Sequence, residues 1–458
     1  MGTLTMVAES VKGHLVGADR AFDSVSTDTR TLQPGQLFFA LHGENFDAAT
    51  FVGEAERRGA AGAVVEQRQS CDLSQVEVSD ARRALGQWGK SWRARFSISV
   101  IAVTGSNGKT TVKEMIASIL AQELGDRAEL LVTEGNLNNE IGLPLTVLKL
   151  CDRHRIAVLE MGASHPKEIA YLADIAAPGI GVVTNAGVAH LEGFGSEEAV
   201  AAAKGELFES LSVGGIAIIN RDDRFFETWR SLAGEATVYS FGLDDAADCR
   251  ASDIQETVAG EQSELKFDIR SGDDTVQVRL PMAGAHNVRN ALAATAAARA
   301  AGASWDAVRR GLAAMNNVSG RLRAVPGSGG ATIYDDSYNA NPGSVGAAID
   351  FLAAHTGQTW LVLGDMAELG PESLQLHREI GAEARKKGVS RLFCVGEQSR
   401  AAAEGFGKEA RWFTDIQSLA DTIMAMPKDG VTILMKGSRC MGLEKLVAIL
   451  QHGSGKRG

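Results

Sequence analysis

Apolar residues in the middle of the chain fall into short runs that end in polar residues. The runs Ile98–Val103, Ile156–Glu160, Gly181–Asn185 and Ile216–Asn220 each predict a buried strand. The segment after the first run has apolar residues at helical spacing: Val112, Met115, Ile116, Ile119, Leu120 and Leu124. Strands that alternate with helices predict a mostly parallel sheet, whose ligands gather at the carboxyl ends of the strands.

The pattern differs on both sides of this central region. Before it, apolar runs at Leu37–Leu41 and Ala60–Val65 flank a helical stretch, which predicts a small α/β unit. Between 237 and 281 apolar and polar residues alternate, which predicts antiparallel strands. The segment 325–330 is rich in glycine and is interpreted as a flexible loop near a domain boundary. Three more strands follow it, each ending in glycine: Trp360–Gly364, Arg391–Gly396 and Val431–Gly437.

Composition narrows the class of protein. A hydrophobic content of 45% is ordinary for a chain with a full core, and the net charge of −11 argues against a general nucleic-acid binder. The five cysteines are scattered and form no Cys-x-x-Cys pair, which predicts reduced thiols. The sequence has neither a signal-peptide pattern nor an apolar segment long enough for a bilayer. We therefore expect a soluble, cytoplasmic protein without membrane insertion.

The nine residues Thr104–Val112 lie between the first strand and the helix. A glycine-rich turn there points backbone N–H groups and the positive helix end at one place, where phosphate binds. The glycine expected five residues before Gly108 is Val103, but the strand–turn–helix context favours a nucleotide triphosphate loop over an ordinary turn. The residues expected to bind the nucleotide here are Gly105, Ser106, Asn107, Gly108, Lys109, Thr110 and Thr111.

Three further side chains could act beside this loop. Glu160 ends a strand of the same sheet, where a carboxylate holds Mg²⁺ in many P-loop proteins, although a solvated carboxylate is an equally good account. His190 lies in a loop after another strand, where a lone histidine is more often a surface residue. Lys204 lies on a helix predicted to begin at Ser196, and taken alone it is an ordinary solubilising charge.

Taken in order, seven stretches resemble those of the Mur peptide ligases. They are Thr104–Thr111, Gly135–Pro144, Val158–Gly162, His190–Gly195, Lys204–Glu206, Gly284–Asn290 and Asp335–Pro342. The resemblance covers nearly the whole chain and is closest to the branch that adds D-alanyl-D-alanine to UDP-N-acetylmuramoyl-tripeptide. Its most specific parts are Asp335–Pro342 and Leu363–Gly370. Val103 in place of the first glycine is normal for this family.

The resemblance implies an α/β fold of three domains. Residues 1–95 would be a small α/β domain that binds the UDP-sugar. Residues 96–320 would be a P-loop-type ATP-binding domain with a mostly parallel sheet, and 321–458 a Rossmann-like, doubly wound domain. The length of 458 residues agrees with this number, at roughly 100–200 residues per domain.

The resemblance also implies an ATP-dependent ligase that uses Mg²⁺, with two ions expected. Lys109 would contact the terminal phosphates, Arg321 would reach phosphate and Asp336 the ribose, while Asn287 and Asn290 would lie near adenine. The implied metal-binding residues are Thr110, Glu160, His190 and Lys204, the last after carbamylation by CO₂. Lys109, Glu160, His190 and Lys204 would form the catalytic set.

The implied substrates are UDP-N-acetylmuramoyl-tripeptide and D-alanyl-D-alanine, bound by a monomer without nucleic acid. Ser26, Asp28 and Arg30 resemble a uridine-side motif, although a polar turn is an equally good account of them. The other implied substrate residues are Asn138, Asn139, Asn339, Asp365, Lys436 and Arg439. The sequence leaves open whether the third residue of the tripeptide is diaminopimelate or lysine.

Three alternative functions are weighed against this one. A sister ligase that adds diaminopimelate or lysine carries an Asp-Asn-Pro-Arg-type motif, which the sequence lacks. Folylpolyglutamate synthase generally lacks a domain before the P-loop. A nucleotide switch or transport ATPase belongs to another class, and the sequence has no Asn-Lys-x-Asp guanine motif to favour it.

Overall fold

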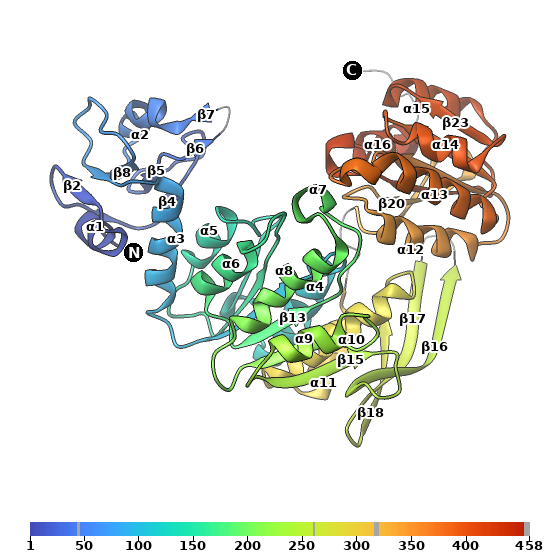
Figure 1. Ribbon diagram of the computed structural model, residues 1–458, viewed down its shortest axis with the longest axis horizontal. Helices are drawn as coiled ribbons and strands as arrows, with labels where there is room; N and C mark the ends of the chain where they lie inside the picture. The colour runs from blue at the N-terminus through green and yellow to red at the C-terminus, as the bar shows by residue number, and fades with distance from the viewer. Residues whose placement is uncertain (44–45, 260–261, 316–319, 453–458) are drawn as a thin grey trace.

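The computed structural model describes residues 1–43, 46–259, 262–315 and 320–452, which form three lobes in chain order (Figure 1). The predicted α/β class is confirmed, because the three larger sheets are mostly parallel and are covered by helices. The domain limits at 95/96 and 320/321 stay a prediction. Every helix in the described part of the chain is too short or too polar to cross a bilayer.

The central sheet has nine strands in the order β11-β12-β10-β13-β14-β15-β16-β17-β18. It is parallel from β11 to β16 and antiparallel from β16 to β18. The bounds are β10 (Ser99–Thr104), β11 (Leu130–Val132), β12 (Ile156–Glu160), β13 (Ile180–Val183), β14 (Ile216–Asn220), β15 (Thr237–Gly242), β16 (Cys249–Ala259), β17 (Gln262–Ser271) and β18 (Asp274–Leu280).

Alternate side chains of β10 pack on opposite faces of this sheet, as the pleat requires. Ile101 and Val103 belong to the core beneath one layer of helices: α4 (Lys109–Leu124), α10 (His286–Ala300) and α11 (Trp305–Ala313). Val100 and Ala102 face the other layer: α5 (Gly142–Val147), α6 (Glu168–Ala176), α8 (Glu197–Glu209) and α9 (Phe226–Leu232). Both faces are therefore buried, which explains why the parallel strands are apolar throughout.

One expectation for this region is partly wrong. The segment 237–281 was predicted to be antiparallel, but β15 pairs in parallel with β14 and β16. Its neighbour β14 is buried on both faces, and a crossover through α9 brings β15 alongside in the same direction. The antiparallel expectation holds for β16, β17 and β18, and Ser271 pairs with Asp274 at the turn where β17 and β18 meet.

The N-terminal lobe has a five-stranded sheet, β2-β9-β8-β5-β4, in which only the pair β2–β9 of the described strands is antiparallel. Its bounds are β2 (His14–Val16), β4 (Val25–Ser26), β5 (Leu37–Phe39), β8 (Gly62–Val65) and β9 (Gln75–Glu77), with helices α1 (Leu4–Val11), α2 (Val52–Arg57) and α3 (Ala81–Arg93). Helix α3 contacts α1 on one side and α5 and α6 on the other, so it joins this lobe to the central one (Figure 1).

The C-terminal lobe has a six-stranded sheet, β19-β20-β24-β21-β22-β23, parallel except for β19. Its strands are β19 (Arg323–Pro326), β20 (Thr332–Asp336), β21 (Thr359–Gly364), β22 (Arg391–Val395), β23 (Ala410–Phe413) and β24 (Thr432–Lys436). Helices α12 (Pro342–Ala353), α13 (Ser373–Lys386) and α14 (Arg400–Phe406) pack on one face, and α15 (Ile416–Ala425) and α16 (Glu444–His452) on the other.

The expectation of a flexible loop at 325–330 is wrong. Val325 and Pro326 end the edge strand β19, and Ser328–Gly330 forms a short 3-10 helix that leads into β20. Proline is compatible with an edge strand because no partner there needs its missing N–H, and Val325 is buried in the core. The five cysteines are free thiols, as predicted.

Candidate active site

The phosphate loop lies between β10 and α4, as its sequence predicts. Gly105 and Gly108 have φ values of +141° and +81°, and a Cβ atom on them would come within 2.0 Å of Thr184 Oγ1 and 2.5 Å of Asn290 Oδ1. Only glycine fits these two places. The amides of Ser106 and Asn107 donate to the backbone oxygen and side-chain oxygen of Asn185, both at 2.9 Å, so neither N–H points to a free phosphate position.

Lys109 begins α4 and folds back over the loop. Its Nζ donates to the carbonyl oxygens of Gly105 at 2.6 Å and Ser106 at 3.3 Å. Burial lowers the pKa of Lys109, the Glu160 carboxylate raises it and the Arg321 guanidinium lowers it. The charges of Lys109, Glu160 and Arg321 therefore lie close enough to interact. Two cations and one carboxylate meet at this edge of the sheet.

Glu160 is the last residue of β12 and pairs in register with Val103 of β10. Its carboxylate is 2% exposed. Oε1 accepts from Asn138 Nδ2 at 2.8 Å, but Oε2 is buried and has no hydrogen-bond partner in the described part of the chain. A buried carboxylate oxygen without a partner is costly, and a bound cation would satisfy it.

Lys204 lies on α8, whose predicted cap is confirmed because the Ser196 side chain accepts from the Ala199 amide. The lysine is 1% exposed, donates to the Ala163 carbonyl at 3.2 Å and stands 5.2 Å from the centre of the Phe194 ring. Burial and the nearby charge of Lys109 lower its pKa to about 7. The lowered pKa favours the uncharged, nucleophilic form of the amine.

His190 contacts the C-terminal lobe. It has a φ of +54° and precedes the short helix α7 (Leu191–Phe194), and its ring Nδ1 pairs with the Glu368 carboxylate. The hydrogen bond from His190 lowers the pKa of Glu368, and the Glu192 amide donates to the Glu368 carbonyl at 3.1 Å. Among the described residues, no group of three or more His, Cys, Asp or Glu side chains has the arrangement of a metal centre.

A cavity of about 330 Å³ opens between the central and C-terminal lobes beside the phosphate loop. The predicted nucleotide residues on its wall are Asn107, Gly108, Thr111, Asn287, Asn290, Arg321 and Asp336. The two asparagines of α10 are buried and joined by a hydrogen bond of 2.9 Å. The structure therefore gathers residues that lie more than 200 positions apart in the sequence.

Two C-terminal side chains reach into the phosphate region. Arg321 donates to Thr110 Oγ1 at 3.4 Å, lies 4.3 Å from the centre of the Tyr338 ring and keeps a buried Nε without a partner among the described residues. Asn341 donates to Asn107 Oδ1 at 2.8 Å. An unpaired guanidinium N–H beside a phosphate loop is suited to an anionic oxygen.

The C-terminal residues expected to bind the substrate lie at the carboxyl ends of the neighbouring strands β20, β24 and β21 or in the segments that follow them. Lys436 lines the nucleotide cavity, where it pairs with Asp336 at 2.6 Å and donates to the Asn339 carbonyl at 3.1 Å. Asp365 is held by the Ser399 amide at 2.7 Å. Arg439 is exposed, with its guanidinium 5.5 Å from the centre of the Tyr338 ring.

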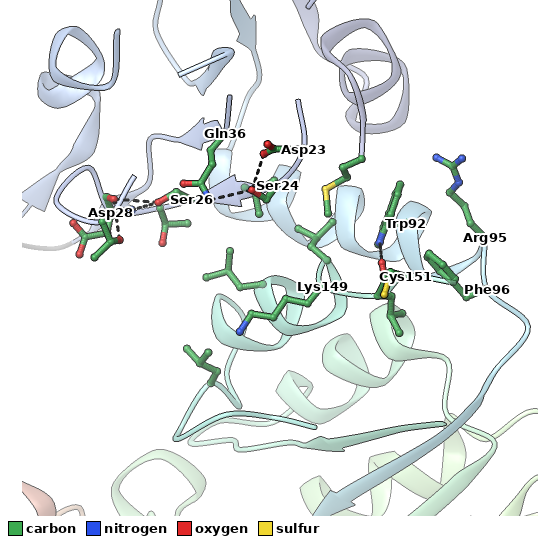
Figure 2. Close-up of a pocket in the computed structure, with 18 of the residues that line it drawn as sticks. Asp23, Ser24, Ser26, Asp28, Gln36, Trp92, Arg95, Phe96, Lys149 and Cys151 are labelled. Carbon is green, nitrogen blue, oxygen red and sulfur yellow. Dashed lines mark hydrogen bonds between the residues drawn. The ribbon is translucent and has the colours of Figure 1, made fainter. Parts of the chain in front are cut away.

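A second cavity, of about 830 Å³, lies between the N-terminal and central lobes. Figure 2 shows Ser26 and Asp28 on one side of it, with Lys149, Trp92 and Cys151 on the other. Its walls are mixed in character, and Lys149 is 46% exposed. A cavity of this size and mixed lining can hold an elongated polar ligand.

Arg30, Asn138 and Asn139 are engaged within the protein. Arg30 pairs with Asp28, lowers the pKa of that carboxyl group and is 86% exposed, outside the cavity wall. Asn138 donates to Glu160, and Asn139 accepts from the amide of Gly142, the first residue of α5, at 2.9 Å. No role is predicted from the sequence for Glu368 or Asn341, although each lies in one of the two most specific motifs.

Comparison with known proteins assigns this arrangement to a class. The model of the Mur ligase middle domain matches residues 103–298, and that of the Mur ligase glutamate ligase domain matches 320–439. The chain belongs to the Mur ligase family. It is 42% identical to the UDP-N-acetylmuramoyl-tripeptide–D-alanyl-D-alanine ligase of Escherichia coli K12 over 98% of both chains.

Solved structures of Mur ligases are similar to this chain over nearly its whole length. The crystal structure of MurF from Acinetobacter baumannii superposes with a TM-score of 0.91 at 34% identity, over 98% of both chains. MurF from Thermotoga maritima in complex with ADP gives 0.82 at 27% identity, over 93% of this chain and 96% of that one. A diaminopimelate ligase and a folylpolyglutamate synthase are 20% and 18% identical, which shows a shared fold alone.

Proposed function

We propose that the chain joins D-alanyl-D-alanine to UDP-N-acetylmuramoyl-tripeptide in peptidoglycan precursor synthesis, at the expense of one ATP. The observation that carries this proposal is the buried carboxylate of Glu160, whose Oε2 has no partner among the described residues, on the strand beside the one that leads into the phosphate loop and Lys109. Its support from comparison is the similarity to named ligases over nearly the full length of both chains.

The first step activates the carboxylate of the tripeptide. A carboxylate oxygen attacks the γ-phosphorus of ATP, the bond to the ADP oxygen breaks, and an acyl phosphate forms. Negative charge spreads over the phosphoryl oxygens as they transfer, and fixed cations stabilise it. Lys109 supplies one of these cations, and Arg321 supplies the other with its unpaired Nε–H.

The second step makes the amide. The amine of D-alanyl-D-alanine attacks the acyl carbonyl, and the tetrahedral intermediate collapses as phosphate leaves with the carboxylate oxygen and the amine gives one proton to solvent. Water must be kept from the acyl phosphate. The contacts Asn341–Asn107 and His190–Glu368 hold the C-terminal lobe against the central lobe, which supports this exclusion.

Mg²⁺ fits the site because Glu160 Oε2 is a buried oxygen without a partner in the described chain. Thr110 and Glu160 would hold one ion with the nucleotide phosphates. His190 and a carbamylated Lys204 would serve a second, because the pKa of about 7 leaves the lysine amine free to add CO₂. Bound Mg²⁺ supplies charge neutralisation at the phosphates.

The cavity between the N-terminal and central lobes is proposed to bind the UDP-sugar part of the substrate. Ser26 and Asp28 line it from the N-terminal lobe, and Lys149, which pairs with Glu134 at 2.8 Å, faces them from the central lobe. Asp365, Lys436 and Arg439 are the candidates for the dipeptide and the anionic groups of the substrate, and Lys436 also pairs with Asp336 on the wall of the nucleotide cavity. We place the reaction in the cytoplasm, where ATP is available, and expect a monomer.

The direct test is an assay of phosphate release and product mass with a panel of amines. Release is expected only with ATP, Mg²⁺, the UDP-muramoyl-tripeptide and D-alanyl-D-alanine together, and both diaminopimelate- and lysine-containing tripeptides are supplied. Lys109→Ala is the inactive control. Release that is independent of the dipeptide, or product formation with glutamate or diaminopimelate as the amine, would contradict the proposal.

A further inference from the structure

Lys113 is a buried charged residue to which the proposed reaction assigns no role. It lies on α4 one helical turn after Lys109 and is 1% exposed. Its Nζ donates to the Thr133 carbonyl at 2.8 Å and pairs with the Glu114 carboxylate at 2.7 Å. A buried ammonium is costly unless it is hydrogen-bonded, so this side chain holds the carbonyl that it contacts.

Thr133 follows the edge strand β11 and is also 1% exposed. Its amide donates to the Val158 carbonyl at 3.1 Å, and its hydroxyl oxygen accepts from the Glu160 amide at 2.9 Å. These two hydrogen bonds attach Thr133 to the C-terminal end of β12. The hydroxyl therefore fixes the backbone of Glu160 at the point where its side chain leaves the sheet.

The segment after Thr133 returns to Glu160 at its carboxylate. Asn138 donates to Glu160 Oε1 at 2.8 Å, and the Asn138 carbonyl accepts from the Gly162 amide at 2.8 Å. Glu160 is thus held at its amide by Thr133 and at one carboxylate oxygen by Asn138. The second carboxylate oxygen, Oε2, is therefore held in a defined orientation. It is buried and has no hydrogen-bond partner among the described residues.

We propose that Thr133 and Lys113 are positioning residues that aim the free oxygen of Glu160 at the cation of the nucleotide. Lys109 and Lys113 are four residues apart and share one face of α4, so the support of Glu160 is tied to the helix that carries the phosphate-binding lysine. The inference rests on the proposed function, because it takes Glu160 to face Mg²⁺.

This arrangement predicts a defect in Mg²⁺ use and not in nucleotide recognition as such. Metal held jointly by a carboxylate and a phosphate depends on the geometry between them, and supporting hydrogen bonds set that geometry. The nucleotide cavity itself contains neither Thr133 nor Lys113 on its wall. A purely structural role would weaken ADP binding equally with and without Mg²⁺.

The test uses the full chain with Thr133→Val, which removes the hydroxyl, and Thr133→Ser, which keeps it. The matched control is Thr146→Val, because Thr146 is also 1% exposed and its hydroxyl donates to the Gly142 carbonyl in α5. Calorimetry measures ADP binding with and without Mg²⁺, and kinetics measures the Mg²⁺ concentration at half-maximal rate. Thermal unfolding of each variant is recorded in parallel.

Thr133→Val is expected to raise the half-maximal Mg²⁺ concentration by about three- to tenfold and to leave Mg²⁺-free ADP affinity unchanged. Thr133→Ser and Thr146→Val are expected to behave as the parent does. Lys113→Met is expected to raise the half-maximal Mg²⁺ concentration as Thr133→Val does. An unaltered Mg²⁺ requirement in folded Thr133→Val and Lys113→Met would overturn the inference, as would equal losses of ADP affinity with and without Mg²⁺.

Glu160→Gln in the same experiment separates the positioning role of Thr133 and Lys113 from the metal-binding role of Glu160. If Glu160→Gln raises the Mg²⁺ requirement and Thr133→Val does not, the positioning role fails and the proposed function stands. If Glu160→Gln leaves the Mg²⁺ requirement unchanged, the metal-binding role of Glu160 fails and the inference fails with it.

Discussion

Asn341 of the C-terminal lobe donates its side-chain N–H to Asn107 Oδ1 of the phosphate loop at 2.8 Å. The same side chain caps α12, because its Oδ1 accepts from the Ser344 amide at 2.9 Å. One amide group therefore begins a helix and joins two lobes beside the nucleotide cavity. The two tasks use different atoms, so a substitution can separate them.

Asn341→Asp is expected to keep the cap and lose the bond between the lobes. A carboxylate caps a helix as well as an amide does, but it cannot donate to Asn107 and would repel its oxygen and the nearby phosphates. We predict a KM for ATP raised about tenfold or more with an unchanged melting temperature. Asn341→Ala, which removes both functions, should also lower the melting temperature. Steady-state kinetics and calorimetric scans check this, and an unchanged KM would contradict it.

Lys204→Ala is expected to lose activity by about 100-fold or more, because the anionic carbamate can no longer form. Acetate or propionate added to this variant should restore part of the rate by placing a carboxylate in the space of the missing side chain. The parent enzyme should gain the mass of one CO₂ in intact-protein mass spectra recorded in bicarbonate. Full activity of the variant, with no adduct on the parent, would count against the modification.

His377 gives the fold a defined pH dependence. It is fully buried, its Nε2 accepts from the Met366 amide at 2.9 Å, and its Nδ1 donates to the Ser373 carbonyl at 2.7 Å. Burial lowers the pKa of His377 below its ordinary value of 6.5, with opposing effects from Ser373 and the Asp365 carboxylate. The neutral ring is therefore the form that fits the folded chain.

Below pH 6.5 the unfolded chain binds a proton at His377 before the folded chain does. The free energy of unfolding therefore falls as pH drops through 6.5 towards the lower folded pKa, by at most about 1.4 kcal/mol per pH unit. His377→Gln should be less stable than the parent at pH 8 and lose less stability between pH 7 and 5. Urea denaturation across this range measures the difference, and parallel curves for the two proteins would disprove the assignment.

Lys149→Ala tests the cavity between the N-terminal and central lobes. We predict a KM for the UDP-muramoyl-tripeptide raised about three- to tenfold, because one cation facing the ligand's phosphates is lost. The KM for ATP should stay the same. Lys90→Ala is the control, since Lys90 is similarly exposed and paired with Asp174, but does not line the cavity. Equal effects of the two substitutions would argue against UDP-sugar binding there.

The sequence predicted the phosphate loop well because its determinants are local. Gly105 and Gly108, an apolar strand before them and an amphipathic helix after them specify the turn without help from the rest of the chain. The helix of Lys204 and its Ser196 cap were equally predictable. Glu160 ends its strand beside Val103, at the edge of the sheet where the phosphate loop begins, as expected for a polar strand end in a parallel sheet.

Contacts between distant segments could not be predicted in this way. Lys436 pairs with Asp336 only because β24 lies beside β20, 100 residues away in sequence, so its place on the wall of the cavity beside the phosphate loop was not predicted. Glu368 meets His190 through the packing of two lobes. Val325 and Pro326, which end β19, were interpreted as part of a loop because a glycine-rich stretch follows them, whereas they belong to a strand that forms by pairing with β20.

The transfer of an oxygen atom tests the central claim most directly. The tripeptide carboxylate is labelled with heavy oxygen (¹⁸O), the full reaction is run with ATP, Mg²⁺ and D-alanyl-D-alanine, and the released phosphate is analysed by mass spectrometry. An acyl phosphate requires one labelled oxygen to leave with the phosphate. Labelled phosphate in step with amide formation is the predicted result, and unlabelled phosphate released alongside the amide would contradict the account.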